Sequence, residues 1–575
     1  MRMKKRRGVQ ISAASLLYGL SCLAGYCVNY PKRFVGTRIT VAVIDAVVFA
    51  GIICVFALAG RALARSVRKR ESEKGNPETG KPGKGNSEKS DVGGRLCRFY
   101  ESHGFLKLFL SFFLVGLVIA VSRYPGIQSG GVRYQYQQFM GMDTLVRRLS
   151  GTQYEGNFIT GHHPVLLTVF FGLFIKAGVM LGQPDWGSFA LSIAVCALNA
   201  LGWAYVLNYF RRYMRPLYWS IAFACLFFNP MFHSFNAYIL KDNLFAAALA
   251  VYCCLLHSVM VNPPGKADIK ALVGWSVLIP FIKNQGIYIV ILCSLALFVF
   301  RKEYRKKLAL CIAAPVLVYN ILFCAVAMPL LRISPGGKQE MYTVFCQTTA
   351  NAINQNPEIM ESDLYEDLHK VFPVNKWSIY DPELSDPIKF TYNPETTRED
   401  MKKFVAAWLR LGKRYPLCYV EAMVNQTSGY YCVDIRTKDW FWYGGEIVIS
   451  DADDRISGPL WDHNLNFCDF LLMAANVPRW KLFFNVAVSF WLIVAAAVAY
   501  NGKQRQLLWI LPVILQWMIC LLSPVNASGR YAVILYEMAP LIAAVSLNSY
   551  CGAPDADNSY REAQAADERQ GEEEN

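Results

Sequence analysis

The chain has 575 residues, of which 54% are hydrophobic, 14% aromatic and only 18% charged. This composition excludes an ordinary soluble protein of such length, because the apolar residues stand in long uninterrupted runs. The formal net charge of +15 is not a nucleic-acid footprint, since no nucleic-acid motif accompanies it and the basic residues flank the apolar runs.

The apolar runs predict membrane helices, because a bilayer core needs about 20 apolar residues per helix. The runs are 11–30, 39–60, 105–122, 187–210, 217–236, 242–261, 270–286, 287–300, 307–331, 480–500, 507–523 and 530–548. We therefore expect an all-α polytopic membrane protein with about 12 transmembrane helices, or about 13 if residues 164–182 also cross. The short runs 270–286 and 287–300 could be two spans or one broken span.

The N-terminal part is expected to be a two-span module, residues 1–60. Its first run follows MRMKKRR and could be a signal peptide, but it is long, lacks a clear cleavage site and is followed at once by a second span. Residues 61–107 carry twelve Lys or Arg against six acids, which predicts a cytoplasmic segment. Within it, 61–104 is expected to be a linker with a disordered, Gly- and Pro-rich centre.

The distribution of charge predicts on which side of the membrane the remaining segments lie. Basic stretches at 211–215, 301–307 and 502–506 are expected in the cytoplasm. Residues 332–479 carry 15 Lys or Arg and 21 Asp or Glu, a net charge of 15 − 21 = −6, which predicts a large, mainly helical extracytoplasmic domain. The other expected parts are a membrane core (105–331), C-terminal spans (480–550) and an acidic cytoplasmic tail (551–575), so both termini are expected in the cytoplasm.

A histidine pair stands in the stretch 157-NFITGHHPVLLTVFFGLF-174. If 105–122 runs outward, 123–163 is an external loop. The span 187–210 must then run inward to reach its basic end, so 164–182 is expected to be a surface or re-entrant helix. His162 and His163 would face the outer water layer, either at a site or simply as markers of the membrane interface.

Polar and basic residues open three helices on this same side. They are His162 and His163, Lys241 and Asp242, and Arg530 and Tyr531. Cations and helix N-termini gathered on one face suit an anionic ligand such as a lipid phosphate. The alternative for Lys241 and Asp242 is structural, with the aspartate capping a helix and the lysine reaching back to water.

These motifs, in this order, resemble a known class of enzymes. YPG at 124–126 precedes a Gln-rich helix; HHP, the Lys-Asp helix start, a large external domain and a late Pro…Arg-Tyr follow. The external stretch 379–431 holds Tyr-x-Pro, then Ser-Asp-Pro-x-Lys, then a Trp-containing helix ending in Tyr-Pro. Over 105–548 the chain resembles GT-C-type membrane glycosyltransferases, and more closely an uncharacterised family of bacterial multi-pass membrane proteins.

The resemblance implies a GT-C-like fold in a bacterial plasma membrane. It implies transfer of a sugar from a polyprenyl-phosphate-linked donor to a cell-envelope glycan, glycolipid or protein on the outer face. Such enzymes need a carboxylate in the first external loop, which acts as a general base on the acceptor or helps to hold a divalent metal. Basic residues elsewhere hold the carrier phosphate, a role that falls here to His163, Lys241 and Arg530.

The expected carboxylate is missing at its usual place. The stretch 124-YPGIQSGGVRYQYQQFMG-141 contains no acid, and Gly130 and Gly131 stand where it is expected. The nearest acids are Asp143 and Glu155, which become the candidate bases. The alternative for Asp143 is an ordinary cap for the helix that follows.

A second class of function stays open because of this gap: a transporter of lipid-linked glycans, or a relative that binds the carrier without turnover. A transporter should show inverted repeats and mid-span charges, and neither is prominent, which favours the transferase. The cysteines show no metal-binding spacing. Those expected outside, Cys346, Cys418, Cys432 and Cys468, permit disulfides, with Cys418–Cys432 the preferred pair.

Overall fold

The computed structural model describes residues 2–29, 35–74, 92–150, 153–236, 238–435, 447–458 and 485–551. The centre of the expected linker, the acidic tail, the start of the expected span 480–500 and Cys468 lie outside these described residues.

Among the described residues, seven helical stretches are long and apolar enough to cross a membrane, which confirms an all-α membrane protein. They are Arg6–Asn29 in α1 (Arg2–Asn29), Thr37–Lys69 in α2 (Val35–Lys74), α4 (Gly104–Ser122), α8 (Pro184–Arg211), α11 (Lys241–Val261), Lys302–Leu330, and Gly529–Asn548, which includes α25 (Val533–Asn548).

Shorter helices complete the bundle. They are α7 (Val165–Met180), α9 (Pro216–Phe227), α10 (Pro230–Asn236), α12 (Lys266–Ile282), α13 (Gly286–Phe300), α23 (Val486–Ala499) and α24 (Leu511–Cys520). The expectation of one continuous span over 217–236 was wrong, because Asn229-Pro230 separates α9 from α10 and proline lacks the N–H that would continue the helix. Residues 270–300 form two helices that meet at Lys283–Gln285.

The expectation that residues 61–104 form a linker throughout was also wrong. Helix α2 continues to Lys74, and α3 (Val92–Phe99) follows the undescribed segment. The sequence 61-RALARSVRKR-70 contains no glycine or proline and is rich in Ala, Leu and Arg, which favour helix.

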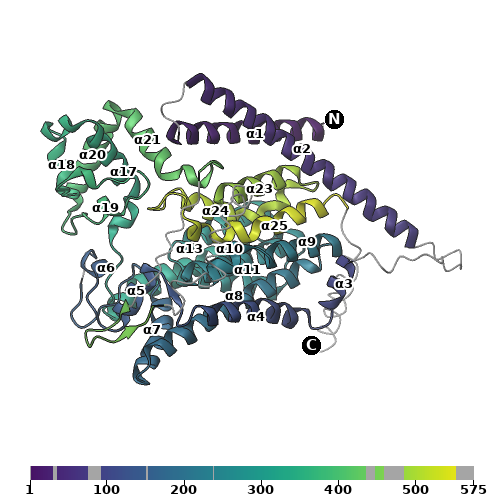
Figure 1. Cartoon of the computed structure of the whole chain (residues 1–575), viewed down its shortest axis with the longest axis horizontal. Coiled ribbons are helices and arrows are strands. Elements are labelled where there is room, and N and C mark those ends of the chain that lie inside the picture. Colours follow the sequence, from purple (N-terminus) through teal and green to yellow (C-terminus); the bar gives the residue numbers. More distant parts are fainter. Residues whose placement is uncertain are drawn as a thin grey trace.

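The long helices lie side by side along the horizontal axis of Figure 1, with α11 in contact with α8, α12 and α25. Almost every side chain of α11 is buried, as expected for a helix apolar on all faces. Helices α1 and α2 form a layer that packs on α23. The helices of residues 343–427 gather at the upper left of the view, whereas α7 lies at the lower left.

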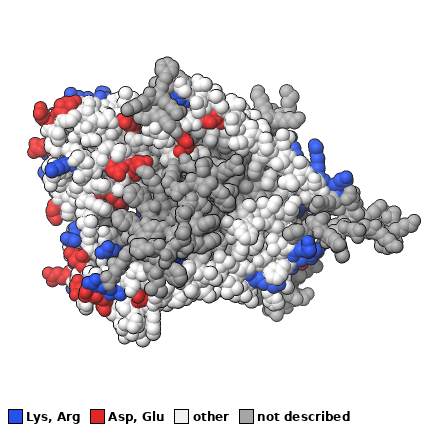
Figure 2. Space-filling view, viewed as in Figure 1, with Lys and Arg blue, Asp and Glu red and all other residues white. Residues whose placement is uncertain are grey.

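The distribution of charged residues on the surface agrees with this arrangement of the helices. In Figure 2, acidic and basic residues mix at the left end, basic residues predominate at the right, and the described surface between them is almost uncharged. Exposed apolar side chains such as Leu114, Val118 and Leu292 belong to the intervening helices. A membrane normal along the horizontal axis accounts for this pattern.

The segment after Leu331 forms the extramembrane domain, which folds around its own hydrophobic core. Helices α17 (Thr343–Gln355), α18 (Tyr365–Val371), α20 (Arg398–Arg414) and α21 (Pro416–Thr427) bury residues that include Phe372, Phe404 and Leu411. The expected Cys418–Cys432 disulfide is not formed. Both thiols are free, because Cys418 lies against Gln355 and Asn356, whereas Cys432 packs on Gly25 of α1.

Candidate functional site

Two short strands bring the YPG loop to the start of α11. Strand β1 (Ile127–Gln128) pairs in parallel with β2 (Tyr238–Ile239). Helix α5 (Gly130–Phe139) leaves one strand and α11, beginning at Lys241, leaves the other. The loop glycines and the Lys-Asp helix start are therefore held at the same end of the bundle.

Backbone contacts fix the histidine loop. The Gly161 N–H donates to the Ser334 carbonyl at 2.7 Å, where the extramembrane domain begins. The side-chain amide of Asn284, between α12 and α13, donates to the Gly161 carbonyl at 2.8 Å, and Tyr319 donates to the Asn284 oxygen at 3.0 Å. The loop thus rests on the turn between the two short helices.

The loop before α25 is tied to the extramembrane domain as well. The Ser385 N–H donates to the Pro524 carbonyl, and the Asn526 N–H donates to the Glu383 carbonyl, each at 2.8 Å. These bonds hold α19 (Asp386–Lys389) beside the segment that carries Arg530.

The three helix starts singled out in the sequence meet in one cluster. Lys241 Nζ lies 3.0 Å from His163 Nδ1. The Arg530 guanidinium stacks 4.7 Å from the Tyr531 ring centroid and donates to its hydroxyl at 2.7 Å. Lys283 Nζ, 5.4 Å from the same ring, links Tyr531 to α11, because it also pairs with Asp242.

Not every charged side chain in the cluster has a partner of opposite charge. Lys283 Nζ and Asp242 Oδ1 form a buried ion pair at 2.6 Å, with side chains 9% and 5% exposed. Among the described residues, no carboxylate lies within 4 Å of Lys241 or Arg530, so two cations remain for an anion. Sequence reasoning missed Lys283, although a lysine between two short apolar runs was the available signal.

The extramembrane domain adds a second group of charges. His162 Nδ1 lies 3.8 Å from Glu340 Oε1, and Lys389 Nζ lies 3.0 Å from Glu340 Oε2 and 2.7 Å from Asp386 Oδ1. The two histidine rings are 4.5 Å apart. Sequence reasoning missed these groups too. The Ser-Asp-Pro-x-Lys motif pointed to Asp386 and Lys389, whereas nothing marked Glu340.

Burial sets the protonation of these side chains. It lowers the pKa of His162 to about 4, although nearby Glu340 acts in the opposite direction, and it lowers the pKa of His163 well below the usual range. Burial alone would raise the pKa of Glu340, but the ammonium of Lys389 lowers it overall. At neutral pH the histidines are uncharged and Glu340 is ionised.

Several buried polar atoms at the site have no hydrogen-bond partner among the described residues, including His162 Nδ1, His163 Nε2 and Glu340 Oε1. The Lys241 ammonium can only donate, so His163 Nδ1 accepts and the ring proton lies on Nε2. The ring lies next to Gly131, where an added Cβ would be 3.4 Å from Cε1 and 3.7 Å from Nε2. A buried donor without an acceptor is costly and invites a ligand oxygen.

The two candidate bases lie elsewhere. Asp143 is 44% exposed and pairs with Arg147 and Arg148 at 3.0 and 3.6 Å. The helix that follows is capped by the Thr144 hydroxyl rather than by Asp143. Glu155 is exposed in a turn. Within the described chain, neither acid contacts the clustered residues, and no group of three or more His, Cys, Asp or Glu could hold a metal ion.

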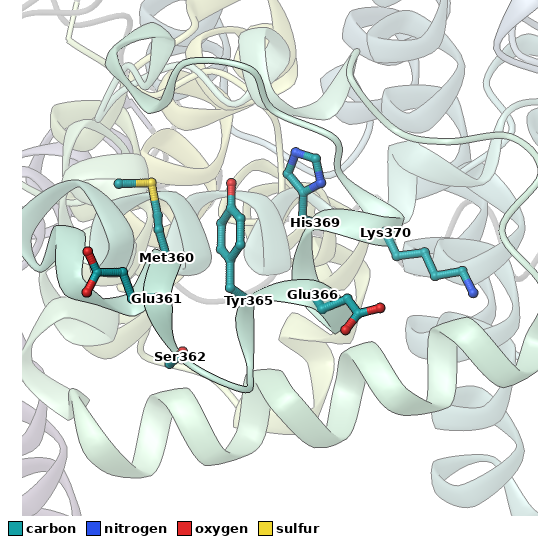
Figure 3. Close-up of a pocket in the computed structure, with 7 residues that line it drawn as sticks. All are labelled: Met360, Glu361, Ser362, Tyr365, Glu366, His369 and Lys370. Carbon is teal, nitrogen blue, oxygen red and sulfur yellow. The ribbon is translucent and has the colours of Figure 1, made fainter.

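A separate pocket of about 460 Å³ opens on the extramembrane domain. Figure 3 shows Tyr365 and His369 projecting side by side from one helix, with Lys370 pointing away from them. Lys370 is paired with Asp400 at 2.7 Å. The pocket shares no lining residue with the charged cluster and has no buried unpartnered polar atom, so it is the weaker candidate.

Acid is expected to destabilise the fold through the histidines. The unfolded chain takes up protons near pH 6.5, whereas His162 stays neutral in the fold until about pH 4. Stability is therefore lost as pH falls from 6.5 towards 4, by about 2 kcal/mol at pH 5 for His162 alone. Unfolding midpoints at pH 8, 6.5 and 5 should show this loss, and His162→Gln should reduce it.

The exposed His103, at a positive φ of 53°, supplies the control, because asparagine tolerates this backbone conformation. His103→Asn should keep the wild-type pH slope. A wild-type slope in His162→Gln would contradict the assignment of a neutral His162.

Comparison with known proteins identifies a family but no activity. The model of DUF6020, described as a family of unknown function, matches residues 30–569. No curated protein and no solved structure matches significantly. The matched range includes every residue of the cluster and all the candidate membrane helices except α1, and the chain therefore belongs to DUF6020, a family of unknown function.

Proposed function

We propose that this protein is a GT-C-like membrane glycosyltransferase. It takes a sugar from a polyprenyl-phosphate-linked donor and transfers it to a cell-envelope glycan, glycolipid or protein on the outer face of a bacterial plasma membrane. The observation that carries the proposal is the cluster in which, among the described residues, no carboxylate pairs with Lys241 or Arg530 and His163 presents an unpartnered N–H.

The proposed orientation follows from charge. The end of the bundle opposite the cluster exposes Lys302, Arg305, Lys306 and Lys307, and basic residues favour the cytoplasmic side. The cluster and the acidic extramembrane domain then lie outside, and both termini lie inside. In this topology about 12 segments cross, and α7, which packs against α5 and α8, lies at the outer surface.

A lipid phosphate suits the cluster in both charge and location. Lys241 and Arg530 stand at the first turns of membrane helices, the depth at which a polyprenyl carrier presents its phosphate. Charge-assisted hydrogen bonds from lysine and arginine to phosphate are strong, and low polarity strengthens them further. The ring of Tyr531 holds the Arg530 guanidinium in place, and the His163 N–H supplies one more hydrogen-bond donor for the phosphate.

Turnover separates the transferase from the second candidate, a transporter or non-catalytic binder. The purified full chain in lipid nanodiscs is offered polyprenyl-phosphate and polyprenyl-diphosphate sugars, and release of the free carrier is followed by mass spectrometry. We expect release from at least one donor. Binding of a carrier without release from any donor would favour the second candidate, and absence of both would contradict the proposed function.

A further inference from the structure

The corner between α20 and α21 exposes apolar and basic side chains side by side. On α21, Leu417 and Val420 are 80% and 61% exposed, and their i, i+3 spacing puts them on one face of the helix. A different face, which carries Cys418 and Ala422, is buried, with Cys418 in the core of the extramembrane domain. The exposed apolar face therefore points away from that core.

Two cations of α20 stand beside this apolar face. Lys413 and Arg414 are exposed in the last turn of α20, directly before the Tyr415-Pro416 step into α21. The Arg414 guanidinium lies 5.4 Å from the centre of the Tyr415 ring, and among the described residues no carboxylate lies within 4 Å of either cation. The helix dipole accounts for basic residues in a last turn, but not for the exposed leucine and valine next to them.

Contacts at the other end of α21 indicate its depth in the membrane. In Figure 1, α21 leads from the extramembrane domain towards α1, against which it packs. Just beyond the end of α21, the Tyr431 carbonyl accepts a hydrogen bond from Ser21 of α1 at 3.1 Å. Ser21 lies eight residues before Asn29, the end of the apolar span, and is therefore about 12 Å inside it. Val420 lies about 10 Å back along α21 from its last residue, so the first turn of α21 and the two cations reach the level of the lipid headgroups.

An anionic bilayer surface fits this corner in both shape and charge. Exposed apolar side chains next to lysine and arginine are typical of helices that lie at a membrane interface. The apolar groups enter the boundary between headgroups and acyl chains, and each cation near anionic headgroups adds attraction. The neighbouring α1 exposes Leu16, Leu17 and Leu20 within its span, so the corner continues the lipid-facing surface of the bundle.

We propose that this corner binds anionic phospholipid in the leaflet on the side of the extramembrane domain. Leu417 and Val420 lie among the glycerol and upper acyl groups, and Lys413 and Arg414 bind lipid phosphates. This contact adds a lipid attachment to the hydrogen bonds that tie the domain to the loop before α25. None of these residues belongs to the charged cluster, so the surface is independent of the proposed function.

The test places the photoreactive amino acid p-benzoylphenylalanine at Leu417 or Val420 of the full chain, in nanodiscs of phosphatidylcholine and phosphatidylglycerol. Lipid adducts formed on illumination are identified by mass spectrometry. We expect adducts from both positions, with a ratio of phosphatidylglycerol to phosphatidylcholine at least about fivefold above that of the nanodisc, the effect of one cation near the phosphate. Lys413→Gln/Arg414→Gln should return this ratio to that of the nanodisc.

Lys402 and Lys403 supply both controls, because they are exposed on the same helix, at least about 16 Å along its axis from Arg414. The probe at Lys402 should form far fewer lipid adducts, and Lys402→Gln/Lys403→Gln should leave the lipid ratio unchanged. Equal adducts at Leu417 and Lys402, or none at Leu417 and Val420, would overturn the inference. So would a lipid ratio that both double variants leave unchanged, or a cross-linked dimer in place of lipid, which would make a second copy of the chain the occupant.

Discussion

Asp242→Asn is expected to lower the free energy of unfolding by about 3–5 kcal/mol, because it leaves a buried lysine without its counter-charge. Lys283 Nζ lies 2.6 Å from Asp242 Oδ1, and both side chains are at least nine-tenths buried. An asparagine keeps the shape of the side chain but not the charge. The unfolding midpoint of the purified protein in detergent measures the effect.

The double variant Asp242→Asn/Lys283→Met separates a charge effect from a shape effect. Removing both charges should recover most of the lost stability, since a buried ion pair is worth little more than an apolar pair of similar volume. The Arg301–Glu303 pair, with Glu303 56% exposed, is the matched surface control. Glu303→Gln should change stability by about 1 kcal/mol or less. A wild-type midpoint in Asp242→Asn would contradict the role assigned to this pair.

The second large effect is expected on ligand affinity. Lys241→Met should weaken binding of polyprenyl phosphate about 100-fold, the loss of one charge-assisted contact in a partly desolvated site. Among the described residues Lys241 contacts His163 at 3.0 Å and has no carboxylate within 4 Å, so the fold does not need its charge for pairing. Isothermal titration or native mass spectrometry of the protein in nanodiscs measures the dissociation constant.

Lys266→Met supplies the control, because Lys266 is exposed at the start of α12, a membrane length from Lys241. It removes the same charge from the chain and should leave affinity unchanged. Equal weakening by both variants would show that net charge, and not the cluster, attracts the lipid.

The class, an all-α membrane protein, could be predicted from the sequence because long apolar runs are compatible with few kinds of structure. Two breaks between helices were also marked in the sequence: Asn229-Pro230 separates α9 from α10, and the polar Lys283–Gln285 turn separates α12 from α13. The extended helix through Lys74 was visible in its helix-forming residues. These are local signals, and local signals are what a single sequence expresses most directly.

The cluster was only partly visible in advance. Counting spans assigned His163, Lys241 and Arg530 to one side of the membrane, yet their contacts depend on the packing of segments far apart in the chain. Glu340 could not be found, because its approach to His162 needs the extramembrane domain to dock through Ser334. Sequence proximity to the YPG motif favoured Asp143, which the structure instead shows in exposed ion pairs with two neighbouring arginines.

The most direct test of the account is a comparison of polyprenyl monophosphate with uncharged polyprenol of the same length, titrated into the wild-type protein in neutral-lipid nanodiscs. The two lipids share the apolar chain and differ only in the phosphate, so the difference in affinity reports the anion site alone. We expect saturable binding of the monophosphate, at least about 100-fold tighter than any binding of the alcohol. Equal affinity for both lipids would contradict it.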